Sequence, residues 1–135
     1  MDKNGYLIDL SESDYTQFGR IDFSAQSQEQ RVFSAIWALE SQVNNGGFAQ
    51  FFDNEGPDTV SFAPTALIAI GAVNCADIVS RAIAIALASS RVPDAAEQLE
   101  GLESEFYGYP DNLTDLLYAY VSVRPTIFGK APVGA

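Results

Sequence analysis

The most constraining feature of the sequence is a long segment whose apolar residues recur every three or four positions. Six such residues follow Ser27, namely Val32, Phe33, Ile36, Trp37, Leu39 and Val43. This spacing places them on one broad face of an α-helix. Ser27 and Gln30 form a Ser-x-x-Gln pattern at the start of the segment, which is typical of a capping box. The segment therefore predicts a long amphipathic helix that begins after Ser27.

Apolar residues at helical spacing recur along most of the remaining chain. An apolar stripe in the segment 94–107 consists of Ala95, Leu99, Leu102 and Phe106. The segment 75–91 is apolar on most sides, and the segment 113–121 has one apolar side. No segment shows the strict alternation of apolar and polar residues that indicates a β-strand. The expected fold is all-α, a single compact domain of about five to seven helices.

Glycines, asparagines and prolines mark the expected helix boundaries. Residues 44–47 should end the first long helix, because Asn and Gly tolerate the left-handed backbone that ends helices. Pro64 suits the first turn of a later helix. Asn74 can cap the next helix, and Asn112 or Thr114 can cap the last one. We expect an N-terminal arm or short helix over residues 1–26, the helical domain over residues 27–128 and a flexible tail over residues 129–135.

The charge balance limits the class of partner. The 135 residues include 18 Asp and Glu but only 7 Lys and Arg, which gives a formal net charge of -11 at pH 7. A chain this acidic repels nucleic acids and anionic membranes and attracts basic proteins. We therefore expect a basic protein as the partner, with no direct binding to nucleic acid or to a membrane.

The lack of histidine and the single cysteine limit the reactions that the chain can catalyse. The chain has no histidine, which removes the usual general base and the commonest metal ligand. Cys75 is the single cysteine, so no disulfide can form within the chain, and a reducing compartment is the natural inference. The first residues lack the apolar core of a signal peptide. We expect a cytoplasmic protein that is not an enzyme, with no catalytic residues, no metal site and no cofactor.

A run of acidic residues near the C-terminus is the first candidate site. Its members lie between Val92 and Val123 without an intervening Lys or Arg: Asp94, Glu97, Glu100, Glu103, Glu105, Asp111 and Asp115. Helical residues three apart lie roughly 5–6 Å from each other. Phosphates of DNA have a comparable density, one per ~3.4 Å of axis on each strand. These acids are therefore the candidate partner-binding surface, and the alternative is a solvated helix face that favours solubility.

The stretch between the first long helix and a cluster of phenylalanines is the second candidate site. It includes Glu40, Asn44, Asn45, Gly46, Gly47, Phe48 and Gln50. One interpretation is a structural corner between two helices, in which the asparagine side chains bond the free backbone groups of the helix ends. The other interpretation is a polar pocket, because a semi-buried acid such as Glu40 can bind a ligand or act in catalysis.

The same stretch carries a resemblance to a known family. Residues 43–52 read VNNGGFAQFF and are followed by Asn54 and Gly56, and residues 66–72 read ALIAIGA. Together with residues 116–128, these motifs resemble a bacterial all-helical family, largely uncharacterised, that contains a DNA-mimic protein. The Asn54–Gly56 spacing is one residue tighter than the N-x-x-G form of that family. The resemblance implies a helical domain. From its DNA-mimic member, it also implies binding to a DNA-binding regulator through surface acids that the motif does not specify.

Three hypotheses follow for the function, and a fourth interpretation, an acidic protein with no electrostatic partner, stays open. The leading one is a non-enzymatic acidic interaction protein, a DNA mimic that binds the basic surface of a DNA-binding protein. The second is an immunity-type protein that neutralises a basic toxin, such as a nuclease, through the same attraction. The third is a small ligand-binding or hydrolytic protein that uses residues 40–45.

Overall fold

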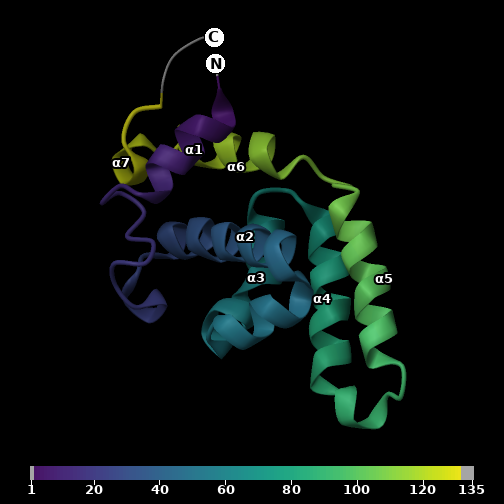
Figure 1. Cartoon of the computed structure of the whole chain (residues 1–135). Coiled ribbons are helices and arrows are strands. Elements are labelled where there is room, and N and C mark those ends of the chain that lie inside the picture. Colours follow the sequence, from purple (N-terminus) through teal and green to yellow (C-terminus); the bar gives the residue numbers. More distant parts are fainter. Residues whose placement is uncertain (1, 132–135) are drawn as a thin grey trace.

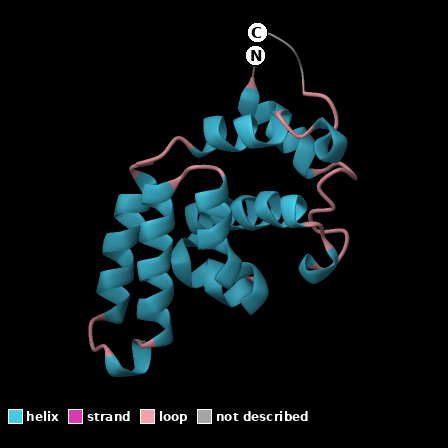
Figure 2. Cartoon of the chain, turned by 180° about the vertical axis from the view of Figure 1, so that it is seen from behind, coloured by secondary structure: helices cyan, strands magenta, loops and turns pink. Residues whose placement is uncertain are grey.

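Helices account for all the regular structure in residues 2–131, which are the residues that this computed structural model describes (Figures 1 and 2). The α-helices are α1 (Lys3–Ser11), α2 (Gln28–Asn54), α3 (Pro57–Ala69), α4 (Val73–Leu87), α5 (Ala95–Tyr107), α6 (Leu113–Ser122) and α7 (Pro125–Phe128). Two short 3-10 helices, η1 (Phe23–Ala25) and η2 (Ser89–Arg91), lie in the connections. The prediction of a compact all-α fold is confirmed, with seven α-helices in this part of the chain. Most of the predicted tail, residues 132–135, lies outside the described residues.

The helices are arranged around α2, which crosses the middle of the molecule (Figure 1). α3 packs along α2, and α4 and α5 form an antiparallel hairpin on one side. α1, α6 and α7 lie together over the other end, so the first and last helices are neighbours through α6 (purple and yellow in Figure 1). The outer face of α5 is therefore at the edge of the molecule.

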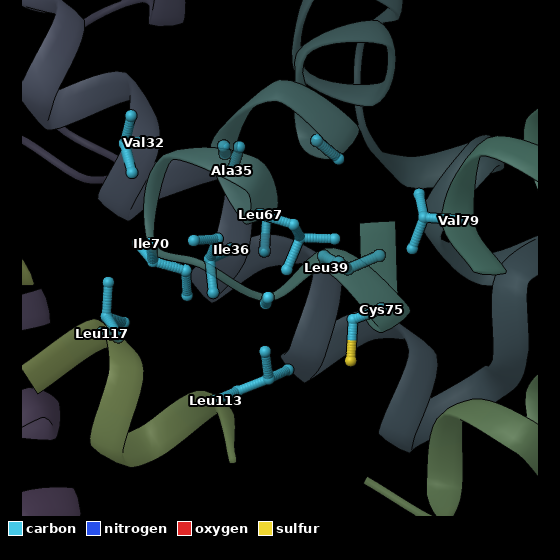
Figure 3. Packing of buried hydrophobic residues seen from close by; sticks show 14 of the residues in the cluster. Val32, Ala35, Ile36, Leu39, Leu67, Ile70, Cys75, Val79, Leu113 and Leu117 are labelled. Atoms are coloured by element: carbon cyan, nitrogen blue, oxygen red, sulfur yellow. The ribbon is translucent and has the colours of Figure 1, made fainter. Parts of the chain in front are cut away.

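The core forms where α2, α3, α4 and α6 converge (Figure 3). Its labelled members in that view are Val32, Ala35, Ile36, Leu39, Leu67, Ile70, Cys75, Val79, Leu113 and Leu117. Five aromatic side chains are also fully buried: Phe33, Phe48, Phe51, Phe106 and Phe128. Burying each apolar side chain of this size contributes roughly 1.5–3 kcal/mol, so the core is the main stabilising element.

Several contacts that local sequence patterns predict are present in the structure. Ser27 accepts a hydrogen bond from the backbone N–H of Gln30, and the Gln30 side chain accepts one from the N–H of Ser27, which completes the capping box. Asn112 caps α6 by accepting from the N–H of Asp115 at 3.0 Å. Asp77 and Arg81 pair along α4 at 3.1 Å.

Two predicted helix starts are wrong. α3 begins at Pro57, seven residues before the expected Pro64, because Pro57 already occupies the first helical position and lacks the N–H that would stay unpaired there. Pro64 lies inside the helix. α4 begins at Val73 with Ala72 as its N-cap residue, and Asn74 lies within the first turn. The uncharged run 59–76 is thus divided between α3 and α4, and no helix within residues 2–131 is long and apolar enough to cross a membrane.

Candidate functional site

The glycine pair in α2 produces a kink where the sequence predicts the end of a helix. The span from Gln28 to Asn54 consists of two helical segments joined at Gly46 and Gly47, whose backbone is not helical, so the predicted end of the first segment at residues 44–47 is confirmed. Gly46 has φ -149° and ψ 22°, and Gly47 has φ 75° and ψ -177°. The second of these conformations is available almost only to glycine. The two glycines therefore redirect the helix without a connecting loop.

Side chains of α5 bond the backbone groups that the kink releases. Glu103 Oε1 accepts a hydrogen bond from the N–H of Phe48 at 2.8 Å, just after the kink. Tyr107 Oη donates to the carbonyl of Val43 at 2.8 Å, just before it. A buried backbone group without such a partner costs about 1–3 kcal/mol. α5 therefore holds both sides of the kink in place.

The asparagines do not perform the capping role expected of them. Asn44 Nδ2 donates to Tyr109 Oη at 2.9 Å, and Asn45 Nδ2 donates to Gln50 Oε1 at 3.0 Å. Both are bonds between side chains. The free backbone groups are bonded instead by Glu103 and Tyr107, which follow the kink by more than 50 residues. No local pattern links residues that far apart in the sequence.

Glu40 lies one turn before Asn44 and faces the same tyrosine. Burial raises the pKa of the Glu40 carboxyl, and a hydrogen bond with Tyr109 partly offsets this by lowering it. Nearby, Cys75 is fully buried, and burial raises the pKa of its thiol to about 12. A thiol with such a pKa stays protonated at neutral pH and is not a nucleophile.

Replacing Glu40 with glutamine should change how stability depends on pH. A carboxyl whose pKa is higher in the folded protein binds more protons there, so wild-type stability falls as pH rises from the unfolded pKa through the folded pKa. Glu40→Gln lacks this titration. We expect the difference in free energy of unfolding, variant minus wild type, to increase over that range and then level off. Urea denaturation of both proteins at closely spaced pH values would measure it, and a constant difference would contradict the raised pKa.

The seven acids of the candidate surface do not form one straight row. Successive residues at i+3 turn about 60° backward around a helix, so a row of four spans half of the circumference. Asp94, Glu97 and Glu100 are exposed, whereas Glu103 is half-buried and faces the kink. Only part of the predicted row can therefore meet a partner along the outer face of α5.

The other three acids have partners within the fold. Glu105 pairs with Arg81 at 3.2 Å, and Asp115 pairs with Lys3 at 3.2 Å. Asp111 accepts from the N–H of Cys75 at 2.7 Å, at the start of α4. Asp111 also accepts from Asn74 Nδ2 at 3.1 Å.

Among the seven acids of the candidate surface, those on the outer face of α5 have no cationic partner in the part of the chain that the structure describes. Asp94 accepts from Gln98 Nε2 at 2.8 Å, a neutral donor that leaves its charge in place. Glu97 and Glu100 have no hydrogen bond or ion pair within the described residues. We define the outer α5 acids as Asp94, Glu97 and Glu100.

Ion pairs neutralise little of the total charge. Within residues 2–131, they join only three cations, Lys3, Arg20 and Arg81, to four acids. Arg81 is shared between Asp77 and Glu105, so that group keeps a net negative charge. Most of the 18 acids thus contribute to an uncompensated negative field around the molecule.

Comparison with known proteins identifies the family of the chain. The model of a family described as DMP19-like protein matches residues 24–124. A search of curated proteins and a search of solved structures found no match. The family match covers most of the chain and includes the kink and α5. The chain therefore belongs to the DMP19-like protein family.

Proposed function

We propose that this chain is a non-enzymatic DNA mimic that occupies the basic surface of a DNA-binding protein. The observation that carries the proposal is a formal net charge of -11 on a protein whose outer α5 acids lack cationic partners. Membership in the DMP19-like family, a family of DNA-mimic proteins, supports the same role.

The physical basis is the attraction between a basic groove and any regular array of negative charges. A DNA-binding surface presents Lys and Arg at the positions of phosphates. Glu97 and Glu100 lie on consecutive turns of a rigid helix, roughly 5–6 Å apart. Charges fixed in this way steer association and set the register of the complex. The outer face of α5 is therefore the proposed centre of the interface.

The small number of candidate catalytic side chains supports a binding function over a catalytic one. It has no histidine. The Cys75 thiol, with a pKa raised to about 12 by burial, is unreactive at neutral pH. Glu40, the remaining candidate, is hydrogen-bonded to Tyr109 beside the structural kink.

The test is a pull-down from host lysate at physiological salt, with captured proteins identified by mass spectrometry. The baits are wild type and the double variant Glu97→Gln, Glu100→Gln. Glu103 stays unchanged because it bonds the kink. A control variant, Asp9→Asn with Glu12→Gln, removes the same charge from exposed acids at the end of α1.

We expect wild type to capture a DNA-binding protein that duplex DNA displaces. Two exposed charge pairs contribute about 1 kcal/mol together, so the α5 double variant should bind about fivefold more weakly. Titration calorimetry with the purified partner measures this loss. The α1 control should lose clearly less affinity. Equal losses in the two variants would show that total charge, not the α5 face, mediates binding. Capture of a nuclease toxin alone would replace DNA mimicry with the immunity-type function.

A further inference from the structure

A polar cleft lies away from α5, between the segment before α2 and the start of α3. Its volume is about 450 Å³, within the range of roughly 300–1,000 Å³ that small-molecule sites occupy. Phe18, Ile21 and Phe23 form apolar walls. The proposed interface on α5 contributes no residue to it.

Three polar side chains in this cleft are almost completely buried. Gln26, Ser34 and Thr59 are 6%, 4% and 7% exposed. Ser34 Oγ donates to Gln26 Oε1 at 2.7 Å, and Gln26 Nε2 donates to the carbonyl of Gln17 at 3.2 Å. These bonds fix the side chains in place, as a ligand site requires.

The hydroxyl of Thr59 is the unusual member. It has no hydrogen bond within residues 2–131, although Thr59 is 93% buried. Its oxygen is not sealed from solvent, because in that part of the chain only Tyr6 Oη is both inaccessible and unpartnered. Thr59 is one of the residues that line the cleft. No described protein group engages this hydroxyl, so it is free to accept a hydrogen bond from a molecule in the cleft.

The remaining polar groups mostly accept hydrogen bonds. Ser34 uses its proton on Gln26, which leaves its oxygen as an acceptor. Glu55 adds a carboxylate at the C-terminal end of α2. Arg20 also lines the cleft, and its guanidinium bonds the carboxylate of Asp14. A complementary ligand must therefore donate hydrogen bonds and tolerate a negative field.

We propose that this cleft binds a small organic amine, with an ammonium group facing Ser34, Thr59 and Glu55 and an apolar ring against Phe18 and Phe23. This site is independent of the proposed DNA mimicry. The aromatic walls favour a flat apolar ring in the ligand. The hydrogen-bond acceptors of the cleft favour a ligand with a charged ammonium group.

Titration calorimetry of the full chain with three matched probes tests the proposal. Tyramine, tyrosol and 4-hydroxyphenylacetate share one ring and differ in a head group that is cationic, neutral or anionic. Physiological salt screens the general attraction of cations to an acidic protein. We expect tyramine to bind at one site, tyrosol about tenfold more weakly, and 4-hydroxyphenylacetate not to bind.

Substitutions of residues in the cleft test whether tyramine binds there. Thr59→Val removes the hydroxyl at constant shape and should weaken tyramine binding about threefold to tenfold without lowering thermal stability. Thr65→Val, an exposed threonine of the same helix outside the cleft, should leave affinity unchanged. Glu55→Gln should reduce the preference for tyramine over tyrosol. Absence of tyramine binding at millimolar concentration, equal binding of all three probes, or unchanged affinity in Thr59→Val would overturn the proposal.

Discussion

Replacing Gly47 with alanine is expected to lower the free energy of unfolding by about 3–5 kcal/mol. Two effects combine. The φ of 75° with ψ of -177° strains any residue that has a Cβ atom, at a cost of about 1–3 kcal/mol. The new Cβ would also overlap Oε1 of Glu103 and lie 2.8 Å from its Cδ. Glu103 would have to leave the N–H of Phe48, and a hydrogen bond to a charged group contributes about 1.5–3 kcal/mol.

Urea denaturation followed by circular dichroism measures this loss. Gly101→Ala is the matched control, because Gly101 lies inside α5 and a Cβ there meets no atom within 4 Å. Alanine in an open helical position should raise stability by about 0.5–1 kcal/mol. A loss below about 1 kcal/mol in Gly47→Ala would show that the kink relaxes easily and that α5 does not hold it.

Replacing Phe48 with alanine should lower the free energy of unfolding by about 3–5 kcal/mol, because it leaves a cavity in the core. Phe48 is 0% exposed. Its ring stacks on Phe52 and meets the edge of Phe106, each with ring centroids 5.9 Å apart. These contacts join the second half of α2 to α5, so the cavity would open beside the kink.

The same denaturation measurement applies to Phe48→Ala. Leu87→Ala is its control, since Leu87 is 81% exposed and surface substitutions change stability by about 0.5 kcal/mol or less. A similar effect in both variants would mean that Phe48 does not anchor the kink to the core.

These predictions bear on the proposed function because α5 has two chemically distinct sides. Its inner side bonds and packs against the kink through Glu103 and Phe106. Its outer side presents Glu97 and Glu100 to solvent. Neutralising Glu103 together with the outer acids would therefore mix a folding defect with a binding defect. Separating the two sides makes the binding test specific.

Patterns among residues close in the sequence were sufficient to predict much of the fold. The capping box of Ser27 and Gln30, the Asn112 cap and the Asp77–Arg81 pair all form as their spacing predicts. The apolar periodicity predicted the helical class for the same reason. Each of these interactions lies within about one helical turn, where backbone geometry alone fixes which side chains meet.

The kink and the acidic surface depended on contacts between distant segments. The sequence showed two glycines, but not that Glu103 and Tyr107 would bond the groups they release. It showed seven acids, but not that Asp111 would bond the start of α4 or that Glu103 would turn inward. The polar cleft likewise brings Gln26 and Ser34 together with Thr59 from another helix. By itself the sequence determined the helical class, the net charge and the absence of histidine. Only tertiary packing decided which acids stay free, because a carboxylate's role depends on which donors the fold places beside it.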